Sequence, residues 1–418
     1  ILRFLGPNLR VANRAPIGTR ESINAATAAS IRGFYERWYR PESSAIIVVG
    51  DGEPADFRRR IDAAFAGWRN PRTPTPAPNL GRLDPRRPTD FLAITEAHAP
   101  SVVQVCRGRD RDPPQREGVA TRTRDFANVI WTSALQDRLG HLAQGANPTF
   151  VQGGAGSDDT LESVVFTCLT LSPRAGDWQG ALRTAATEMR RLETYGLTAQ
   201  EYQSQVNQIT ASLIDGVNST DTMPAPALAD AILFNFNNHG TFSTAAEDRR
   251  IGEAALRRLS RDAVRTEFRR VWTQAGQPLI VVVSPTDVPL AQVRRVWTQA
   301  YAAAPPPPRD VSTAAWAYTS FGPPGRPVTR EAMDNPPFTR IEFANGVRVN
   351  FRQTQNAADR VEIRIRFGGG DQELAPADAR VARVGASLFP LMCLGRNSYE
   401  DIARVCQGRL CDIHLGVD

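Results

Sequence analysis

The hydrophobic pattern from Ser30 to Asp51 predicts a helix followed by a buried strand. Four large apolar residues recur at helical spacing and would share one face of an amphipathic helix: Ile31, Phe34, Tyr35 and Trp38. Pro41 ends this helix, because proline has no backbone N–H and its ring clashes with the preceding turn. Residues 45–49 form an uninterrupted apolar run, which is typical of a strand covered on both faces.

The same pattern recurs in the stretch 261–285. Phe268 corresponds to Phe34, 234 positions earlier, and the apolar run at 279–283 corresponds to the run at 45–49. A second amphipathic helix follows the strand in both copies. The offset is far longer than a solenoid repeat and suits a duplicated domain.

Two proline-rich linkers, 71–89 and 304–335, divide the chain into three parts. Residues 90–303 have the length of a whole domain. By contrast, 1–70 carries only the repeated helix–strand unit, and 336–418 stops before that unit is reached. We therefore expect one complete domain between the closing part of a first domain and the opening part of a third.

Further elements follow from the same kinds of pattern. The first twenty residues are expected to be extended. In the middle part the pattern predicts strands at 101–106, 148–154 and 161–171, and helices at 119–142, 178–195 and 198–214. In the last part, Asn345-Gly346 between alternating apolar residues predicts a hairpin. A strand at 361–367 and helices at 376–391 and 398–407 are expected after it.

Arginine supplies the positive charge of the chain. The formal net charge is +6, and the sequence contains no lysine. Arginine favours phosphate, so nucleic-acid binding is one interpretation. The arginines alternate with acidic residues, however, which favours solvated helix faces and no nucleic-acid partner. No stretch approaches the roughly 18 consecutive apolar residues of a membrane span.

The five cysteines are Cys106, Cys168, Cys393, Cys406 and Cys411, and they show no CxxC spacing. A zinc site built on sulfur is therefore not indicated. Cys106 and Cys168 lie in expected strands of one domain and could be neighbours, and Cys406 and Cys411 are near enough in sequence to bridge. Buried thiols remain the favoured interpretation, because cysteine is commonly a small core residue.

No catalytic motif is present. The four histidines are His98, His141, His239 and His414, and no two lie within five positions of each other, so HxxEH and HExxH are both absent. We expect His98 in a turn and His141 near a helix C-terminus. The glycines at 368–370 predict a turn, since no Lys-Ser/Thr follows them. The sequence therefore indicates no catalytic and no metal-ligating residue.

Several segments, in order, resemble the pitrilysin/insulysin-type zinc metallopeptidases, the inverzincins. The residues that carry the resemblance are RAPIGTRESI with FYERWYRPESSAIIVVGD, NPTFVQGGAGSDDTLESVVFTCLTL, and TRIEFANGVRVNFRQT with VEIRIRFGGGDQE. The resemblance implies an α+β protein of tandem α/β-roll domains. Each domain would have a mostly antiparallel sheet with helices on one side, and together they would form part of a clamshell half.

The family resemblance implies a zinc ion held by the two histidines of HxxEH and a distal glutamate. In the family this motif would precede Ile1. In the third domain its place falls on residues 379–384, where arginine and valine cannot bind zinc. We therefore expect zinc in the full-length family enzyme, none in this chain, and no activity from this chain alone.

The resemblance also implies one binding strand. In insulysin-like relatives the strand that corresponds to Phe150, Val151, Gln152, Gly153 and Gly154 can pair with a substrate's N-terminal part. An open sheet edge whose glycines leave the backbone bare suits addition of a peptide as an extra strand. An ordinary bulged strand is the alternative, and the residues by themselves favour it.

These observations lead to one functional hypothesis and one alternative. The chain is expected to be a portion of a zinc metalloendopeptidase that hydrolyses peptides in an enclosed chamber, supplying chamber wall and substrate contacts. Its partners would be peptide substrates and a missing catalytic half-domain or partner subunit. The alternative is a non-catalytic partner or scaffold subunit of the same family. The family resemblance also suggests that the protein is soluble and periplasmic.

Overall fold

The chain forms two compact units. The computed structural model describes residues 1–14, 16–113, 117–160, 163–310, 316–355, 360–389, 395–398, 401–402, 405–406, 411 and 413–417. The first unit consists of residues 1–205, 224–243 and 251–309, and the second unit consists of the remainder.

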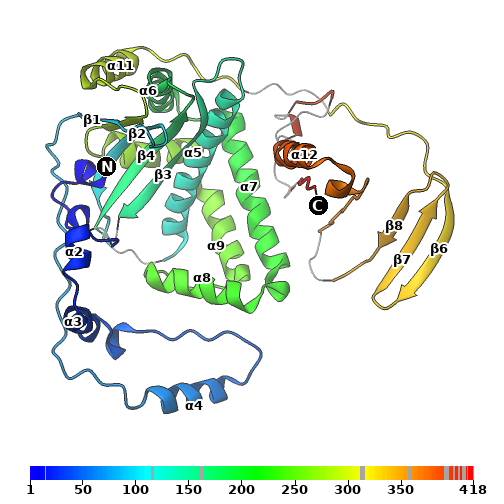
Figure 1. Cartoon of the computed structure of the whole chain (residues 1–418), viewed down its shortest axis with the longest axis horizontal. Coiled ribbons are helices and arrows are strands. Elements are labelled where there is room, and N and C mark those ends of the chain that lie inside the picture. The colour runs from blue at the N-terminus through cyan, green and yellow to red at the C-terminus, as the bar shows by residue number, and fades with distance from the viewer. Residues whose placement is uncertain are drawn as a thin grey trace. The chain divides into compact units, whose positions relative to one another are not determined.

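A five-stranded sheet is the centre of the first unit (Figure 1). Its strands are β1 (Asp90–Thr95), β2 (Val102–Asp110), β3 (Phe150–Thr160), β4 (Val164–Pro173) and β5 (Leu279–Ser284), in the spatial order β1-β5-β2-β4-β3. β5 pairs parallel with β1, whereas the other three pairs are antiparallel. The predicted mostly antiparallel α+β fold is confirmed.

Helices lie between these strands and after them along the chain, and some of them pack against the sheet. They are α5 (Val119–Ala143), α6 (Trp178–Tyr195), α7 (Ala199–Asn218), α8 (Ala225–Asn237), α9 (Ala245–Arg258), α10 (Arg261–Phe268), the π-helix η4 (Arg269–Thr273) and α11 (Leu290–Ala302). α5 contacts β3, α6 contacts β2 and β4, and α11 contacts β1. Arg107 of β2 points toward this layer, with its guanidinium 5.2 Å from the ring centre of Trp272.

The N-terminal segment (residues 1–14) covers the opposite face of the sheet. It was expected to be extended, but it contains α1 (Leu2–Leu5) and the 3₁₀ turn η1 (Val11–Asn13). Leu5 and Leu9 are buried in one cluster with Cys106 and the β5 side chains that point away from the helices. The reason is that a sheet with apolar side chains on both faces must be covered on each face to remove those side chains from water.

The second copy of the repeated pattern forms the core of the first unit. Every residue of β5 is buried, and Phe268 packs edge-on against Trp131 with ring centres 5.2 Å apart. Burying a side chain of this size contributes about 1.5–3 kcal/mol. The helix, strand and following helix predicted here are confirmed.

The first copy differs. The predicted helix is present as α3 (Ala28–Trp38), between α2 (Arg20–Asn24) and α4 (Pro54–Phe65). However, residues 44–50 form no strand and are not covered, so the predicted buried strand is wrong for the chain as it stands. Phe34 is 61% exposed, whereas its counterpart Phe268 is 1% exposed. A strand needs a neighbour to pair with, and no described strand lies beside this one.

The second unit contains a three-stranded sheet of β6 (Pro327–Asp334), β7 (Pro337–Phe343) and β8 (Arg348–Phe351), in that order. The β7–β8 hairpin is the predicted one, and Gly346 adopts φ +84° in its turn. Residues 361–367 form no strand, so the strand predicted there is wrong in the present chain.

The 3₁₀ turn η5 (Gly370–Glu373) and α12 (Pro376–Leu388) follow residues 361–367. The turn at the glycines and the helix after it are confirmed, although the predicted helix end at 390–391 and parts of 398–407 lie outside the described residues. Cys393 lies outside them as well.

A disulfide joins Cys106 of β2 to Cys168 of β4. The two cysteines are directly opposite each other in the antiparallel pair, with Cα atoms 4.1 Å apart. The preference for buried thiols is therefore wrong for this pair, because strand register placed the two residues face to face. Cys406 and Cys411 are not bridged to each other.

Replacing both Cys106 and Cys168 with alanine is expected to lower the free energy of unfolding by about 2–4 kcal/mol. The bond closes a loop between residues 62 positions apart, so its loss enlarges the unfolded ensemble. Urea unfolding of the first unit measures the change. The Cys406→Ala/Cys411→Ala variant is the control and should unfold like the wild type. Equal stability of both variants would contradict the prediction.

Candidate peptide-binding strand

β3 is an edge strand. It pairs only with β4, and no described strand lies along its other side. The strand is 11 residues long, which leaves a row of backbone N–H and C=O groups without a ladder partner. All five residues of the predicted binding segment lie in its first half, so the structure places them together on an open sheet edge.

The strand begins with an anchor and a bulge. Phe150 is buried in the core, opposite Pro173 of β4. The pairing register then shifts, so that Gln152 is opposite Ser172 and Val151 is the extra residue of a β-bulge. Val151 is 56% exposed. Both features considered from the sequence, the bulge and the open edge, therefore occur in the same strand.

The glycines of β3 differ in how much space surrounds them. A Cβ atom on Gly153 would lie 2.3 Å from Cδ2 of Leu171 and 3.3 Å from Cδ1 of Leu139, so close packing requires glycine there. Around Gly154 the nearest atom would be Oε1 of Gln136 at 3.8 Å, and around Gly156 there is open space. The surface beside the strand is bare at these two positions.

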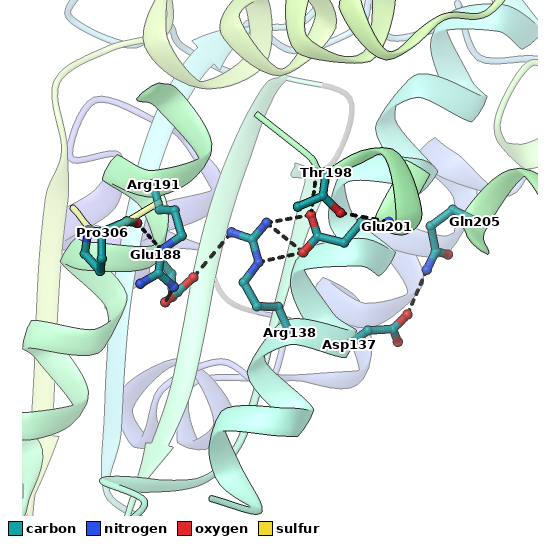
Figure 2. Close-up of polar contacts among 8 residues, drawn as sticks. All are labelled: Asp137, Arg138, Glu188, Arg191, Thr198, Glu201, Gln205 and Pro306. Carbon is teal, nitrogen blue, oxygen red and sulfur yellow. Dashed lines mark hydrogen bonds and ion pairs between the residues drawn. The ribbon is translucent and has the colours of Figure 1, made fainter. Parts of the chain in front are cut away.

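α5 supports β3, and an ion-pair network holds α5. Arg138 of α5 makes a two-pronged contact with Glu201 of α7, with Nε–Oε1 and Nη2–Oε2 distances of 2.8 Å (Figure 2). Its Nη1 lies 3.4 Å from Oε2 of the buried Glu188 on α6, which also pairs with Arg191. Such bidentate pairs are the strong ones, and here they fix the helix that lies against the strand.

Two further contacts extend this network. Glu201 and Thr198 form a capping box at the start of α7, with Thr198 N–H donating to Oε2 at 2.8 Å and Glu201 N–H donating to Oγ1 at 3.1 Å. Asp137 accepts a hydrogen bond of 2.7 Å from Gln205 (Figure 2). The sequence interpretation missed these residues. The Thr-x-x-Glu spacing was a readable signal, whereas the long-range pairs had none.

A second polar cluster ties β2 to the helices. Glu193 of α6 accepts hydrogen bonds from Nε1 of Trp272, at 2.9 Å, and from the hydroxyl of Tyr301. Arg107 lies 3.1 Å from the same hydroxyl. Burial, together with the hydrogen bond to Glu193, raises the pKa of Tyr301 to about 12. These contacts tie β2 to α6, η4 and α11, although Nε of Arg107 is buried without a hydrogen-bond partner.

The histidines do not converge. His98 lies in an exposed turn and His141 in the last turn of α5, as expected, while His239 follows α8 with φ 55°. Among the described residues, no three His, Cys, Asp or Glu side chains form a group able to hold a metal ion. In the described part of the chain, no helix is long and apolar enough to cross a membrane.

Comparison with known proteins finds a peptidase-family match in part of the chain. Residues 25–209 match the family described as "Peptidase M16 inactive domain". The probable zinc protease PqqL of Escherichia coli (strain K12) is 46% identical over 48 residues, which are 12% of this chain and 5% of that protein. This part of the chain is therefore similar to an M16 peptidase domain. The resemblance to pitrilysin/insulysin-type metallopeptidases is thereby confirmed.

Other relatives match more of the chain. The chloroplastic stromal processing peptidase of Pisum sativum is 26% identical over 291 residues, covering 56% of this chain and 23% of the relative. The Oryza sativa subsp. japonica protein of the same name is 23% identical over 519 residues, covering 99% of this chain and 40% of the relative. The chain thus spans less than half the length of these curated relatives.

Solved structures share the fold. The crystal structure of the periplasmic protease PqqL from Escherichia coli has a TM-score of 0.65 at 15% identity, covering 97% of this chain and 45% of that chain. The ferredoxin protease FusC, as a mutant in complex with Arabidopsis ferredoxin, has a TM-score of 0.63 at 17% identity, covering 97% of this chain and 46% of that chain.

M16 peptidases depend on zinc, and the described residues do not fit that ion. The sequence contains no HxxEH, and the four histidines are far apart along the chain. The helix after residues 361–367 carries Arg380 and Arg383 where the motif was sought.

Gly153→Ala is expected to destabilise the first unit by about 1–3 kcal/mol, because the new methyl group collides with the buried Leu171. Gly154→Ala is the matched control one position away, where the methyl group fits, and its effect should stay within about 0.5 kcal/mol. Thermal unfolding of both variants tests the pair. Equal melting temperatures would contradict the packing argument.

Tyr301→Phe is expected to flatten the alkaline pH dependence of stability. The folded-state pKa of about 12 lies above the ordinary 10.0, so the phenol's contribution is complete below pH 10.0 and is lost as the pH rises through about 12. The stability difference between wild type and variant should therefore shrink over that window. Urea unfolding at several pH values measures it, and a constant difference would contradict the assignment.

Proposed function

We propose that this chain supplies wall and substrate contacts to a zinc-dependent M16 peptidase that hydrolyses peptides inside an enclosed chamber. The open edge of β3 is the observation that carries the proposal. An extended peptide adds to such an edge through main-chain hydrogen bonds, which bind many sequences because every residue has the same backbone. A peptidase wall needs this kind of contact.

The geometry of β3 supports binding at its first half. Phe150 anchors the strand in the core, and the bulge at Val151 turns the next residues. Gly154 and Gly156 leave room beside the strand for the side chains of an added peptide. α5 holds the strand from behind through the Arg138–Glu201 pair, so the edge is presented on a rigid support.

The zinc ligands and the general base would come from a catalytic half-domain or partner subunit outside these 418 residues. This chain then contributes binding and enclosure, and is inactive alone. The alternative is a non-catalytic scaffold subunit of the same family. It is favoured by the arginines of α12 in place of a zinc motif and by the description of the matched family as an inactive domain.

We place the protein in the periplasm. The Cys106–Cys168 disulfide supports an oxidising compartment, because such bonds persist outside the reducing cytosol. The relative PqqL is described as periplasmic, whereas the stromal processing peptidases are chloroplastic.

Binding of a fluorescent extended peptide to the 418-residue chain tests the proposal. Two versions of the peptide, N-methylated on alternate amides, form the matched pair. Strand addition uses only every second N–H of the peptide, so one methylated version should bind at least about tenfold more weakly, a loss of about 1.4 kcal/mol, and the other should bind normally. Equal affinity of the two versions would exclude strand addition.

Zinc analysis of the same preparation tests the proposal that the zinc ligands come from outside this chain. The purified chain is expected to hold no stoichiometric zinc and to leave peptides intact. Tightly held zinc at one ion per chain would contradict the claim that the ligands are supplied from elsewhere.

A further inference from the structure

The second linker begins as a docked segment. We call residues 305–308, which are consecutive prolines, the strap. Pro305 is buried, and its carbonyl oxygen accepts a hydrogen bond of 3.1 Å from the hydroxyl of Tyr195 on α6. The carbonyl oxygen of Pro306 accepts one of 2.9 Å from Nε of Arg191 (Figure 2). Proline suits such a segment, because its fixed φ lowers the conformational entropy that is lost on docking.

Arg191 connects the strap to a buried carboxylate. Its Nε donates to the strap, while its Nη1 donates to Oε1 of Glu188, one turn earlier on α6. Glu188 is 2% exposed, and its other oxygen, Oε2, lies 3.4 Å from Nη1 of Arg138 on α5. A buried charge is costly unless it is paired, so Glu188 depends on both arginines.

The contacts continue from Glu188 to the helix behind β3. Arg138 holds α5 to the first turn of α7 through its two bonds of 2.8 Å to Glu201 (Figure 2). A connected set of polar contacts therefore runs from the strap to α5, entirely within the first unit. The chain passes into the second unit between residues 309 and 310, directly after the strap.

We propose that the strap is a conformational device that controls how firmly α5 is held. While it is docked, the strap keeps Arg191 against Glu188, and Glu188 keeps Arg138 in place. When the strap is released, Arg191 loses its carbonyl partner and turns toward water, so Glu188 is left with one arginine. α5 and the start of α7 then open more often.

The position of the strap gives this device its input. The chain between the strap and the second unit is short, so a displacement of the second unit pulls on the strap first. The coupling is reciprocal by thermodynamic necessity: whatever firms α5 also favours the docked strap.

Strap release is independent of peptide binding by β3. Its readouts are proteolysis and hydrogen exchange in the 418-residue chain without peptide. A negative result would therefore leave the peptide and zinc experiments untouched.

Pro305→Gly/Pro306→Gly tests the release. The variant keeps both carbonyl acceptors but makes the segment flexible, so the docked state should be less populated. Trypsin cleavage after Arg309 requires the neighbouring residues to leave α6, and it should become about tenfold faster. Hydrogen exchange in residues 136–143 of α5 and 199–205 of α7 should become faster in parallel.

Two further variants accompany this one. Tyr195→Phe removes only the hydroxyl that holds the strap, and it should change the same two readouts in the same direction, by about threefold or more. Pro74→Gly/Pro76→Gly makes the matched change in the first linker, where residues 71–79 are all exposed. This control should leave cleavage after Arg309 and exchange in α5 unchanged.

Glu188→Gln separates coupling from simple docking. It removes the charge shared by Arg191 and Arg138, so the strap replacement made in this background should still accelerate cleavage but should no longer change exchange in α5. Tyr195→Phe, which leaves Glu188 intact, keeps the test open where Glu188→Gln does not fold. Cleavage that is not accelerated by either strap variant, or α5 exchange that stays constant while cleavage accelerates, would overturn the proposal.

Discussion

A central strand must find hydrogen-bond partners along both of its edges, and this requirement organises the complete domain. β5 arrives late in the chain and enters between β1 and β2, which lie near the domain's beginning. Its insertion brings α10 and α11 onto the sheet, and these helices bury Phe268, Trp272 and Trp297. The core therefore depends on contacts between segments far apart in sequence. Bringing them together costs chain entropy, and the packing of the completed sheet offsets that cost.

β3 lies at the opposite edge of the sheet from β1. It pairs with β4 on one side, and no described strand lies along its other side. The buried ion pairs around Arg138 hold α5 behind it. β3 thus presents an exposed backbone edge supported by α5, and it lies within residues 25–209, which match the family described as "Peptidase M16 inactive domain".

Local patterns predicted most of the elements. The Asn345-Gly346 turn, the long helix of α5 and the strand at 279–284 depend on nearby residues, and each is present. Residues 150–154 were correctly predicted to lie in a strand, and the bulge considered for that strand is present. The disulfide and the Arg138–Glu201 pair were not predicted as such, because strand register and helix packing bring their members together over 62 and 63 positions.

The sequence by itself determined that two stretches have the same helix–strand pattern, and its motifs showed a resemblance to one family of peptidases. Only the tertiary structure decided that one stretch is buried in a sheet and the other is not. Phe268 is buried and Phe34 is exposed, although both have the same helical spacing. Helix formation is set by neighbours along the chain, whereas burial and strand pairing require a partner surface, and only the second copy has one within the described chain.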